Sequence, residues 1–252
     1  MHTNNLHPVL RVDNATIQYK TPTTLHTATY KVSFDMHAQD RFILLGPSGC
    51  GKSTLLKAAG GYLPLVEGSM TLHGMPITGP GIERMMVFQE FDQLAPWKTV
   101  LGNVMFPLVH GKKMPKAQAR EKALHYLQKV KLSAHADKYP HQLSGGMKAR
   151  VAIARGMAAE PAMLLMDEPF AALDALTRRT MQDELLALMV ETKGTLLFIT
   201  HDLSEAVRIG SRILVLSANP GQVIYECDGV ADTDDVHACA ELEAHLATLL
   251  QH

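Results

Sequence analysis

The chain has 252 residues, 46% of them hydrophobic and 19% charged, which is enough for one large domain or two modest ones. Its 24 lysines and arginines are balanced by 25 aspartates and glutamates, so we expect no general electrostatic footprint for nucleic acid or an anionic membrane surface. No stretch approaches the roughly 18 apolar residues of a spanning helix, so a membrane function would need another chain to cross the bilayer.

The N-terminal residues and the cysteines predict a reducing, cytosolic compartment. The first five residues lack the cationic segment and the apolar core of a secretion signal. The cysteines are odd in number and lack the spacing of a metal site; they are Cys50, Cys227 and Cys239.

The first forty residues predict antiparallel strands. Tyr30, Val32, Phe34 and Met36 alternate with polar residues, so we expect all four, Tyr30 included, to lie on the core face of one strand. Residues 42–45 form a short apolar run that ends in glycine, which is typical of a strand buried on both faces. A helix over 53–60 and strands over 69–72 and 85–89 are expected next.

From about residue 100 to 160 the pattern becomes helical, and apolar strand-like runs then return. Met181, Leu185, Leu188 and Met189 share one face of a predicted helix. Buried strands alternating with helices, with a helical block between them, predict an α/β fold with a mainly parallel core sheet. The remaining expected elements are strands over 162–166, 196–200 and 213–216, an edge strand over 223–225 and a helix over 241–250.

Residues 46–53 read Gly-Pro-Ser-Gly-Cys-Gly-Lys-Ser and match the phosphate-binding loop pattern G-x-x-x-x-G-K-[ST]. Glycines let backbone N–H groups turn inward around phosphate oxygens, and the following helix N-terminus adds its positive end. We expect Lys52 to reach the β and γ phosphates and the Ser53 hydroxyl to ligate Mg²⁺. The alternative, a glycine-rich turn with a chance lysine, does not account for the strand before it and the helix after it. The predicted nucleotide-binding residues here are Gly46, Pro47, Ser48, Gly49, Cys50, Gly51, Lys52, Ser53 and Thr54.

Two carboxylates, Asp167 and Glu168, follow a buried strand at its C-terminal end, where ligands bind in open α/β sheets. Asp167 is predicted to hold the Mg²⁺ shell, and Glu168 to polarise the attacking water as general base. An acidic strand end that only caps the next helix is the alternative.

Leu143-Ser144-Gly145-Gly146 precedes a helix over 148–159. Ser144 resembles an N-cap, and the amides of Gly145 and Gly146 offer a second anion site. A plain helix cap is the competing interpretation of this segment.

Together these residues resemble the ABC transporter ATP-binding family, over roughly residues 10 to 225. Leu143-Ser144-Gly145-Gly146 is similar to the family signature, which implies that Ser144 and its glycines touch the γ-phosphate held by the opposite subunit. Met147 departs from the glutamine that the family more often has there.

The same resemblance implies roles for four further residues, each with a simpler alternative. Gln89 resembles the glutamine that links Mg²⁺ and water to the transmembrane contact, or is a polar strand end. His201 resembles the switch histidine at the γ-phosphate, or is a surface histidine before the capping box that starts at Asp202. Asp174 matches a loop that crosses the dimer interface, and could also cap a helix. Tyr19 resembles the aromatic that stacks on adenine, or is an ordinary tyrosine.

The implied fold is a P-loop NTPase core, flanked by an N-terminal antiparallel β subdomain. One ABC ATPase domain is expected over residues 1–252, with a helical subdomain inserted at about 91–155. The implied cofactors are ATP and Mg²⁺. Segments such as Leu94-Ala95-Pro96-Trp97 are most similar to importers of the taurine, sulfonate and nitrate group.

The partners implied are a second copy of the chain through an ATP sandwich, separate transmembrane permease subunits, and a solute-binding protein acting indirectly. Nucleic acid is not an expected partner, and the implied location is the cytoplasmic face of the membrane, as a peripheral subunit. Residues 91–104 are expected to dock the permease; alternatively, Trp97 packs the subdomain core.

Two other classes of function compete with a transporter ATPase. Soluble ABC ATPases that act on ribosomes or DNA resemble paired cassettes or one cassette split by a coiled coil, but only about 90 residues separate Lys52 from Ser144 and no sustained heptads occur. A kinase with the same loop would lack the signature segment and His201.

Overall fold

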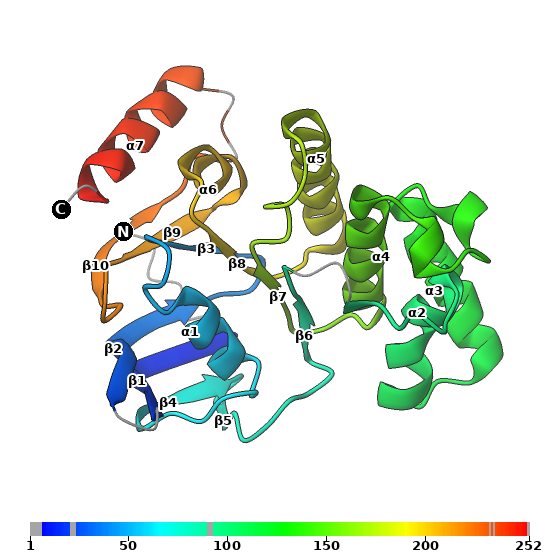
Figure 1. Cartoon of the computed structure of the whole chain (residues 1–252), viewed down its shortest axis with the longest axis horizontal. Helices are drawn as coiled ribbons and strands as arrows, with labels where there is room; N and C mark the ends of the chain where they lie inside the picture. The colour runs from blue at the N-terminus through cyan, green and yellow to red at the C-terminus, as the bar shows by residue number, and fades with distance from the viewer. Residues whose placement is uncertain (1–6, 21–23, 90–92, 232, 234, 251–252) are drawn as a thin grey trace. The chain divides into compact units, whose positions relative to one another are not determined.

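The structure is a computed structural model that describes residues 7–20, 24–89, 93–231, 233 and 235–250. The chain forms two compact units. Figure 1 colours the chain by residue number, from blue at the N-terminus to red at the C-terminus. The first combines residues 1–80 with 195–252, and the second comprises residues 81–194. Among the described residues, no helix has both the length and the apolar character needed to cross a membrane.

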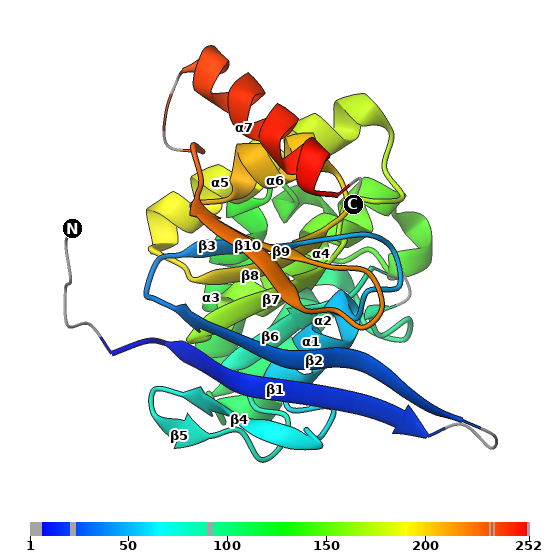
Figure 2. The ribbon, with the colours of Figure 1, turned by 90° about the vertical axis from the view of Figure 1, so that its left-hand side faces the viewer.

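The N-terminal part of the first unit is an antiparallel sheet in the order β2-β1-β4-β5, and Figure 2 shows β1 and β2 running side by side. The central strand β1 is buried on its inner face through Val12, Ala15 and Ile17. The antiparallel arrangement predicted for this region is therefore confirmed. The strands are β1 (Leu10–Lys20), β2 (Leu25–Met36), β4 (Glu67–Leu72) and β5 (Met75–Pro76).

The prediction that Tyr30 lies in the strand core is wrong, because Tyr30 is 40% exposed. A β-bulge is the cause. Ala15 pairs with Val32 and Ile17 with Thr29, so three residue steps on β2 oppose two on β1. Lys31, inside the bulge, has φ 48°. The strict alternation is broken there and resumes at Val32, which is buried.

The second sheet of the first unit is built around β3 (Arg41–Leu45), whose residues are all buried. It pairs in parallel with β8 (Leu196–Thr200) and with β9 (Arg212–Leu216), and β9 pairs antiparallel with β10 (Val223–Asp228). A strand covered on both faces reads as a continuous apolar run, and the buried strands predicted at β3, β8 and β9 are confirmed. The edge strand predicted over 223–225 is confirmed as β10, which is mostly exposed at the end of its sheet. Helix α1 (Lys52–Ala59) follows β3 and contacts β8, and α6 (Leu203–Ile209) follows β8.

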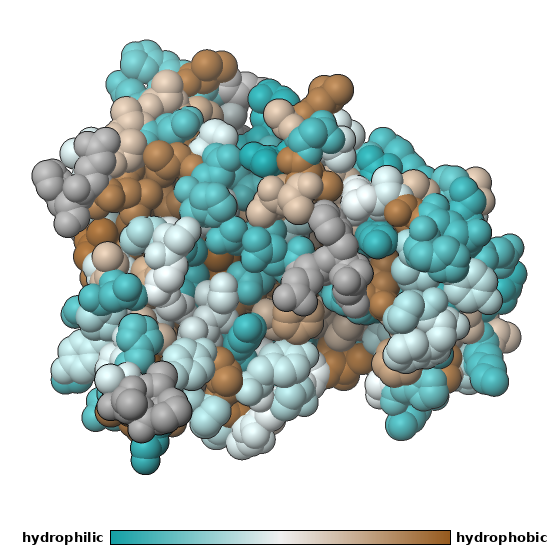
Figure 3. All heavy atoms as spheres, in the orientation of Figure 1, coloured by the Kyte–Doolittle hydropathy of each residue, from teal (hydrophilic) through white to brown (hydrophobic). Residues whose placement is uncertain are grey.

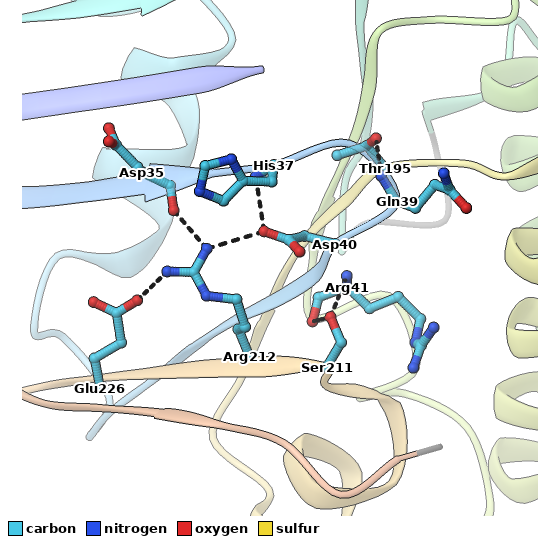
Figure 4. A network of polar contacts seen from close by, with 9 residues as sticks. All are labelled: Asp35, His37, Gln39, Asp40, Arg41, Thr195, Ser211, Arg212 and Glu226. Carbon is cyan, nitrogen blue, oxygen red and sulfur yellow. Dashed lines mark hydrogen bonds and ion pairs between the residues drawn. The ribbon is translucent and has the colours of Figure 1, made fainter. Parts of the chain in front are cut away.

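One arginine ties the strand ends of this unit together. Arg212 donates to the Asp35 carbonyl at 2.7 Å and to the Asp40 carboxylate at 3.0 Å, and it also pairs with Glu226 (Figure 4). Its guanidinium lies 5.0 Å from the ring centre of Phe42. A half-buried guanidinium needs several acceptors, and this arrangement supplies them from β2, the turn before β3, and β10.

The last helix, α7 (Val236–Leu249), starts five residues before the predicted start at 241. The Asp235 side chain caps it by accepting hydrogen bonds from the amides of His237 and Ala238. The helix contacts α6, with Leu246 fully buried, and hydrophobic side chains gather over these two helices at the upper left of Figure 3.

The second unit contains a two-stranded parallel pair and a group of helices. In the strand pair, β6 (Arg84–Val87) lies beside β7 (Met163–Asp167). A Cβ on Gly156 would lie 2.7 Å from Leu164, so a glycine lets α4 approach β7 closely. The predicted apolar face of α5 is confirmed, since Met181, Leu185, Leu188 and Met189 are buried. The helices are α2 (Val100–Phe106), a π-helix (Pro107–Gly111), α3 (Lys116–Lys129), α4 (Gly145–Ala158) and α5 (Ala175–Thr192), with short 3₁₀ turns at Ser133–His135 and Pro140–Gln142.

Helices α2, α3 and α4 pack against one another within this unit. The helical subdomain predicted at about 91–155 falls within the second unit, residues 81–194. That these residues form a subdomain of their own stays a prediction.

Candidate functional site

The predicted phosphate loop lies between β3 and α1, as its pattern requires. Gly49 and Gly51 have φ values of 81° and 94°, which favour glycine. A Cβ on Gly51 would lie 2.5 Å from the Ala28 carbonyl oxygen of β2. The backbone of the loop is therefore pressed against β2, and position 51 has no room for a side chain.

Lys52 is buried at the first position of α1. Its Nζ donates to the carbonyl oxygens of Gly46 at 2.7 Å and Pro47 at 2.9 Å. A buried ammonium must be compensated, and the loop's own carbonyls do this while they hold the charge inside the loop. Ser53 follows in the first turn of α1, where the backbone amides face the loop. This arrangement can bind an anion through a cation and a helix N-terminus together.

Tyr19 lies near the end of β1 and its hydroxyl donates to the Thr54 hydroxyl at 2.9 Å. Tyr19 is 38% exposed, so a planar ligand could reach it. Nothing in the sequence indicates the bond to Thr54, because the two residues are 35 positions apart.

His201 follows β8 directly and is exposed. The next residue, Asp202, caps α6 by accepting from the Glu205 amide at 3.1 Å, so the start of a helix predicted there is confirmed. The phosphate loop, Tyr19 and His201 are all in the first unit. Within this unit, the hydroxyl contact with Thr54 brings Tyr19 to α1, the helix that follows the loop.

Asp167 is the last residue of β7 and is buried, whereas Glu168 is half-buried. Glu168 has φ 44°, in the left-handed region that residues other than glycine seldom adopt. Such a conformation costs about 1–3 kcal/mol and is concentrated at active sites. Its carbonyl accepts from the Ala171 amide at 3.2 Å, which closes a turn after the strand. Two carboxylates at a strand end, one held in a strained backbone, suit the handling of a metal and a proton.

Two helix caps carry the other predicted residues of the second unit. The Ser144 hydroxyl accepts from the Met147 amide at 3.3 Å at the start of α4, and Asp174 accepts from the Thr177 amide at 3.0 Å at the start of α5. A Cβ on Gly146 would lie 3.1 Å from the Thr177 side chain, so the two helix starts are close together. The capping roles are confirmed, and contacts to a nucleotide across a dimer stay predictions.

The charge of Asp174 is favoured by its position. Hydrogen bonds from the Thr177 side chain and then from its amide hold the pKa of Asp174 below its ordinary value.

Gln89 is exposed and lies two residues beyond the end of β6. Gln89, Ser144 with its glycines, Asp167, Glu168 and Asp174 all belong to the second unit.

Comparison with known proteins identifies the family. A family model described as ABC transporter matches residues 29–171. The chain is 45% identical over 223 residues to the taurine import ATP-binding protein TauB of Rhizobium johnstonii, covering 87% of this chain and 84% of that protein. It is 43% identical over 214 residues to an uncharacterized ABC transporter ATP-binding protein of Methanocaldococcus jannaschii, covering 85% of this chain and 79% of the relative.

Solved structures agree in fold. A dimeric ATP-binding cassette in a post-hydrolysis state, bound to ADP and Pi, is similar with a TM-score of 0.76 and 32% identity, covering 87% of this chain and 98% of that chain. The protein cbiO1 from Clostridium perfringens, part of the ABC transporter complex cbiONQ, is similar with a TM-score of 0.79 and 25% identity, covering 97% of this chain and 98% of that chain. The chain therefore belongs to the ABC transporter family and is an ATP-hydrolysing cassette with the P-loop NTPase fold.

Proposed function

We propose that this chain is the ATP-hydrolysing subunit of an importer, which energises uptake of a small anion of the taurine, sulfonate and nitrate kind. The importer role is supported by the 45% identity to a taurine import ATP-binding protein over most of both chains. The ATP site is supported above all by Lys52, whose ammonium is buried inside a phosphate loop with two carbonyl partners.

The residues of the first unit supply nucleotide recognition. Lys52 and the loop amides bind the β and γ phosphates, and Tyr19 stacks on adenine. His201 contacts the γ-phosphate. Its place directly after β8 puts it at the same strand ends from which the loop begins, because β3 and β8 are parallel neighbours.

Hydrolysis needs a metal and a base. The donors present fit Mg²⁺, which prefers oxygen ligands and binds one or two protein groups together with phosphate oxygens. The Ser53 hydroxyl and the Asp167 carboxylate would hold it, with Gln89 near its water, and the ion would neutralise charge on the phosphates. Glu168 accepts the proton of the attacking water, and its backbone is held in the left-handed region, at φ 44°.

The chain works as a pair. Ser144, Gly145 and Gly146 at the start of α4 offer hydroxyl and amide groups to the γ-phosphate bound by the other copy, and Asp174 lies beside them at the start of α5. A solved relative of 32% identity is a dimer, which supports this arrangement. The cassette would sit at the cytoplasmic face of the membrane with separate permease subunits and, through them, a solute-binding protein.

The permease docks on the stretch 91–104, of which Phe91 and residue 92 lie outside the part of the chain that the structure describes. Trp97 is 76% exposed, which disfavours the alternative that it packs the core of a helical subdomain. Phe106 is 48% exposed, and the Lys98 ammonium lies 5.3 Å from its ring centre. Exposed aromatic side chains of this kind anchor protein interfaces.

The test is solute-stimulated ATP hydrolysis by the complex of this chain with its co-purified permease in proteoliposomes. Taurine, an alkanesulfonate and nitrate are supplied in turn with the binding protein, and Lys52→Ala serves as the inactive control. We expect one of these anions to stimulate phosphate release. If none of them does while a chemically different solute does, the proposed substrate class is wrong.

A further inference from the structure

We propose that Gly221 is a positioning residue for nucleotide binding, which holds the phosphate loop in its binding conformation from the outside. Gly221 ends the turn Asn219–Gly221 between β9 and β10, 171 positions after Cys50 of the loop. The inference rests on the proposed function of the loop, and all of its residues belong to the first unit.

Both backbone polar groups of Gly221 are bonded to β2. Its amide donates to the Ala28 carbonyl at 2.9 Å, and its carbonyl accepts from the Tyr30 amide at 2.9 Å. Thr29, between these two residues, forms an isolated parallel bridge with Gly221. The turn is therefore attached to the same short stretch of β2 against which Gly51 is pressed.

Gly221 also lies against the loop itself. A Cβ at this position would lie only 2.1 Å from the carbonyl oxygen of Cys50, a distance that no real side chain can adopt. Gly221 has no positive φ, so the close approach, and not the backbone conformation, requires a glycine here.

This contact bears on the phosphate site through one peptide bond. The Cys50 carbonyl and the Gly51 amide belong to the same planar trans peptide, so they point in opposite directions. When Gly221 and β2 fix where the Cys50 carbonyl lies, they also fix the direction of the Gly51 N–H. Phosphate-binding loops bind their anion with such N–H groups, which must converge on one point.

The turn is stiff enough to act as a support. The Ser217 amide donates to the Gln222 carbonyl at 2.9 Å, and its hydroxyl donates to the Pro220 carbonyl at 3.0 Å. The Gln222 amide donates back to the same hydroxyl at 3.1 Å. Because Ser217 closes the turn in this way, a methyl group added at Gly221 would displace the loop more readily than the turn.

The first test compares Gly221→Ala with Gly79→Ala. A Cβ on Gly79 meets nothing within 4 Å, so this variant adds the same methyl group without a clash. Affinity for a fluorescent ATP analogue is measured well below the melting temperature. We expect Gly221→Ala to bind about tenfold or more weakly, since forced overpacking displaces a backbone that must be placed accurately. Gly79→Ala should bind like the wild type.

A second readout does not depend on nucleotide. In a background with Cys227→Ser and Cys239→Ser, the alkylation rate of Cys50 reports how well the loop is held, because Cys50 is 1% exposed. Gly221→Ala should raise this rate several-fold, as a displaced loop exposes the thiol. Ser217→Ala, which loosens the turn without adding bulk, should shift both readouts in the same direction by a smaller factor.

The outcomes separate the two proposals. Wild-type ATP affinity and wild-type Cys50 alkylation in a folded Gly221→Ala protein would overturn the positioning role. If Gly221→Ala does not fold, Ser217→Ala decides, and wild-type values for both readouts in that variant overturn it. Lys52→Ala is measured in parallel: if it binds the analogue like the wild type, the loop is not the nucleotide site and the proposed function fails.

Discussion

Replacing Glu168 with glutamine should separate ATP binding from ATP hydrolysis. The exchange keeps the size of a half-buried side chain, and it leaves the backbone at φ 44° and the turn to Ala171 unchanged. Asp167 stays buried at the end of β7, so the metal ligand is retained. The exchange removes the negative charge of the carboxylate and, with it, the ability to accept a proton from the attacking water.

The expected loss follows from that single change. Removing a general base typically slows the chemical step about 10²–10⁴-fold, equivalent to roughly 2.7–5.4 kcal/mol of barrier. Because ATP then persists, the two copies of the chain remain joined through it. Each bound ATP stabilises the dimer by about 2.7 kcal/mol when its concentration is a hundred times the dissociation constant.

Light scattering of the purified chain with and without Mg²⁺–ATP measures the dimer, and phosphate release measures hydrolysis. Glu168→Gln should be a dimer with ATP and a monomer without it. Adding Ser144→Arg places bulk and charge at the start of α4, and this should prevent the dimer. Wild-type hydrolysis by Glu168→Gln would remove Glu168 from its role as base, and a dimer that tolerates Ser144→Arg would refute the sandwich.

The remaining predictions concern the loop, the docking surface, a cap and a structural arginine. With the other two cysteines changed to serine, alkylated Cys50 should no longer bind ATP, and bound ATP should slow the alkylation; a labelled protein that still binds ATP contradicts this. The variant Trp97→Cys should crosslink to the permease, and the absence of crosslinks from every position over 91–104 would exclude docking there. The pKa of Asp174 is lowered, chiefly by Thr177, so its cap stabilises α5 at neutral pH and is lost only as pH falls below the ordinary aspartate value. The stability difference between the wild type and Asp174→Asn should therefore shrink in acid, and a difference independent of pH would refute this. Arg212→Lys should lower the free energy of unfolding by about 1–3 kcal/mol in urea titrations, because the planar fork bonded to several acceptors is lost; an unchanged midpoint would show that the network is not stabilising.

The sequence alone predicts those features of the fold that depend on a local pattern of residues. The buried strand over 196–200 has the predicted bounds, because a strand covered on both faces appears as an unbroken apolar run. Ser144 and Asp174 were foreseen as caps for a similar reason, since a capping side chain acts on an amide only three residues away.

Features that depend on non-local pairing could not be predicted. Tyr30 has the alternation of a core residue, but a bulge against β1 turns it outward. The contact of Gly221 with Cys50 could not be predicted from the sequence, because Asn-Pro-Gly indicates a turn without indicating what the turn packs against. For Trp97, the choice between core and surface depended on its environment, and its exposure decides against the core.

The site residues divide in the same way. Lys52 and its loop could be placed from spacing alone, because the pattern itself encodes a strand, a turn and a helix. The strained backbone at Glu168 and the bond from Tyr19 to Thr54 are three-dimensional properties that no spacing reveals.

Solute accumulation in vesicles tests most directly whether hydrolysis by this chain drives import. The permease and this chain are reconstituted in vesicles, and ATP or a non-hydrolysable analogue is supplied on the side of the membrane that carries the chain. Labelled solute and binding protein are placed on the opposite side. The wild type with ATP should accumulate solute against its gradient, whereas Glu168→Gln with ATP and the wild type with the analogue should not. Equal accumulation by Glu168→Gln would contradict the account.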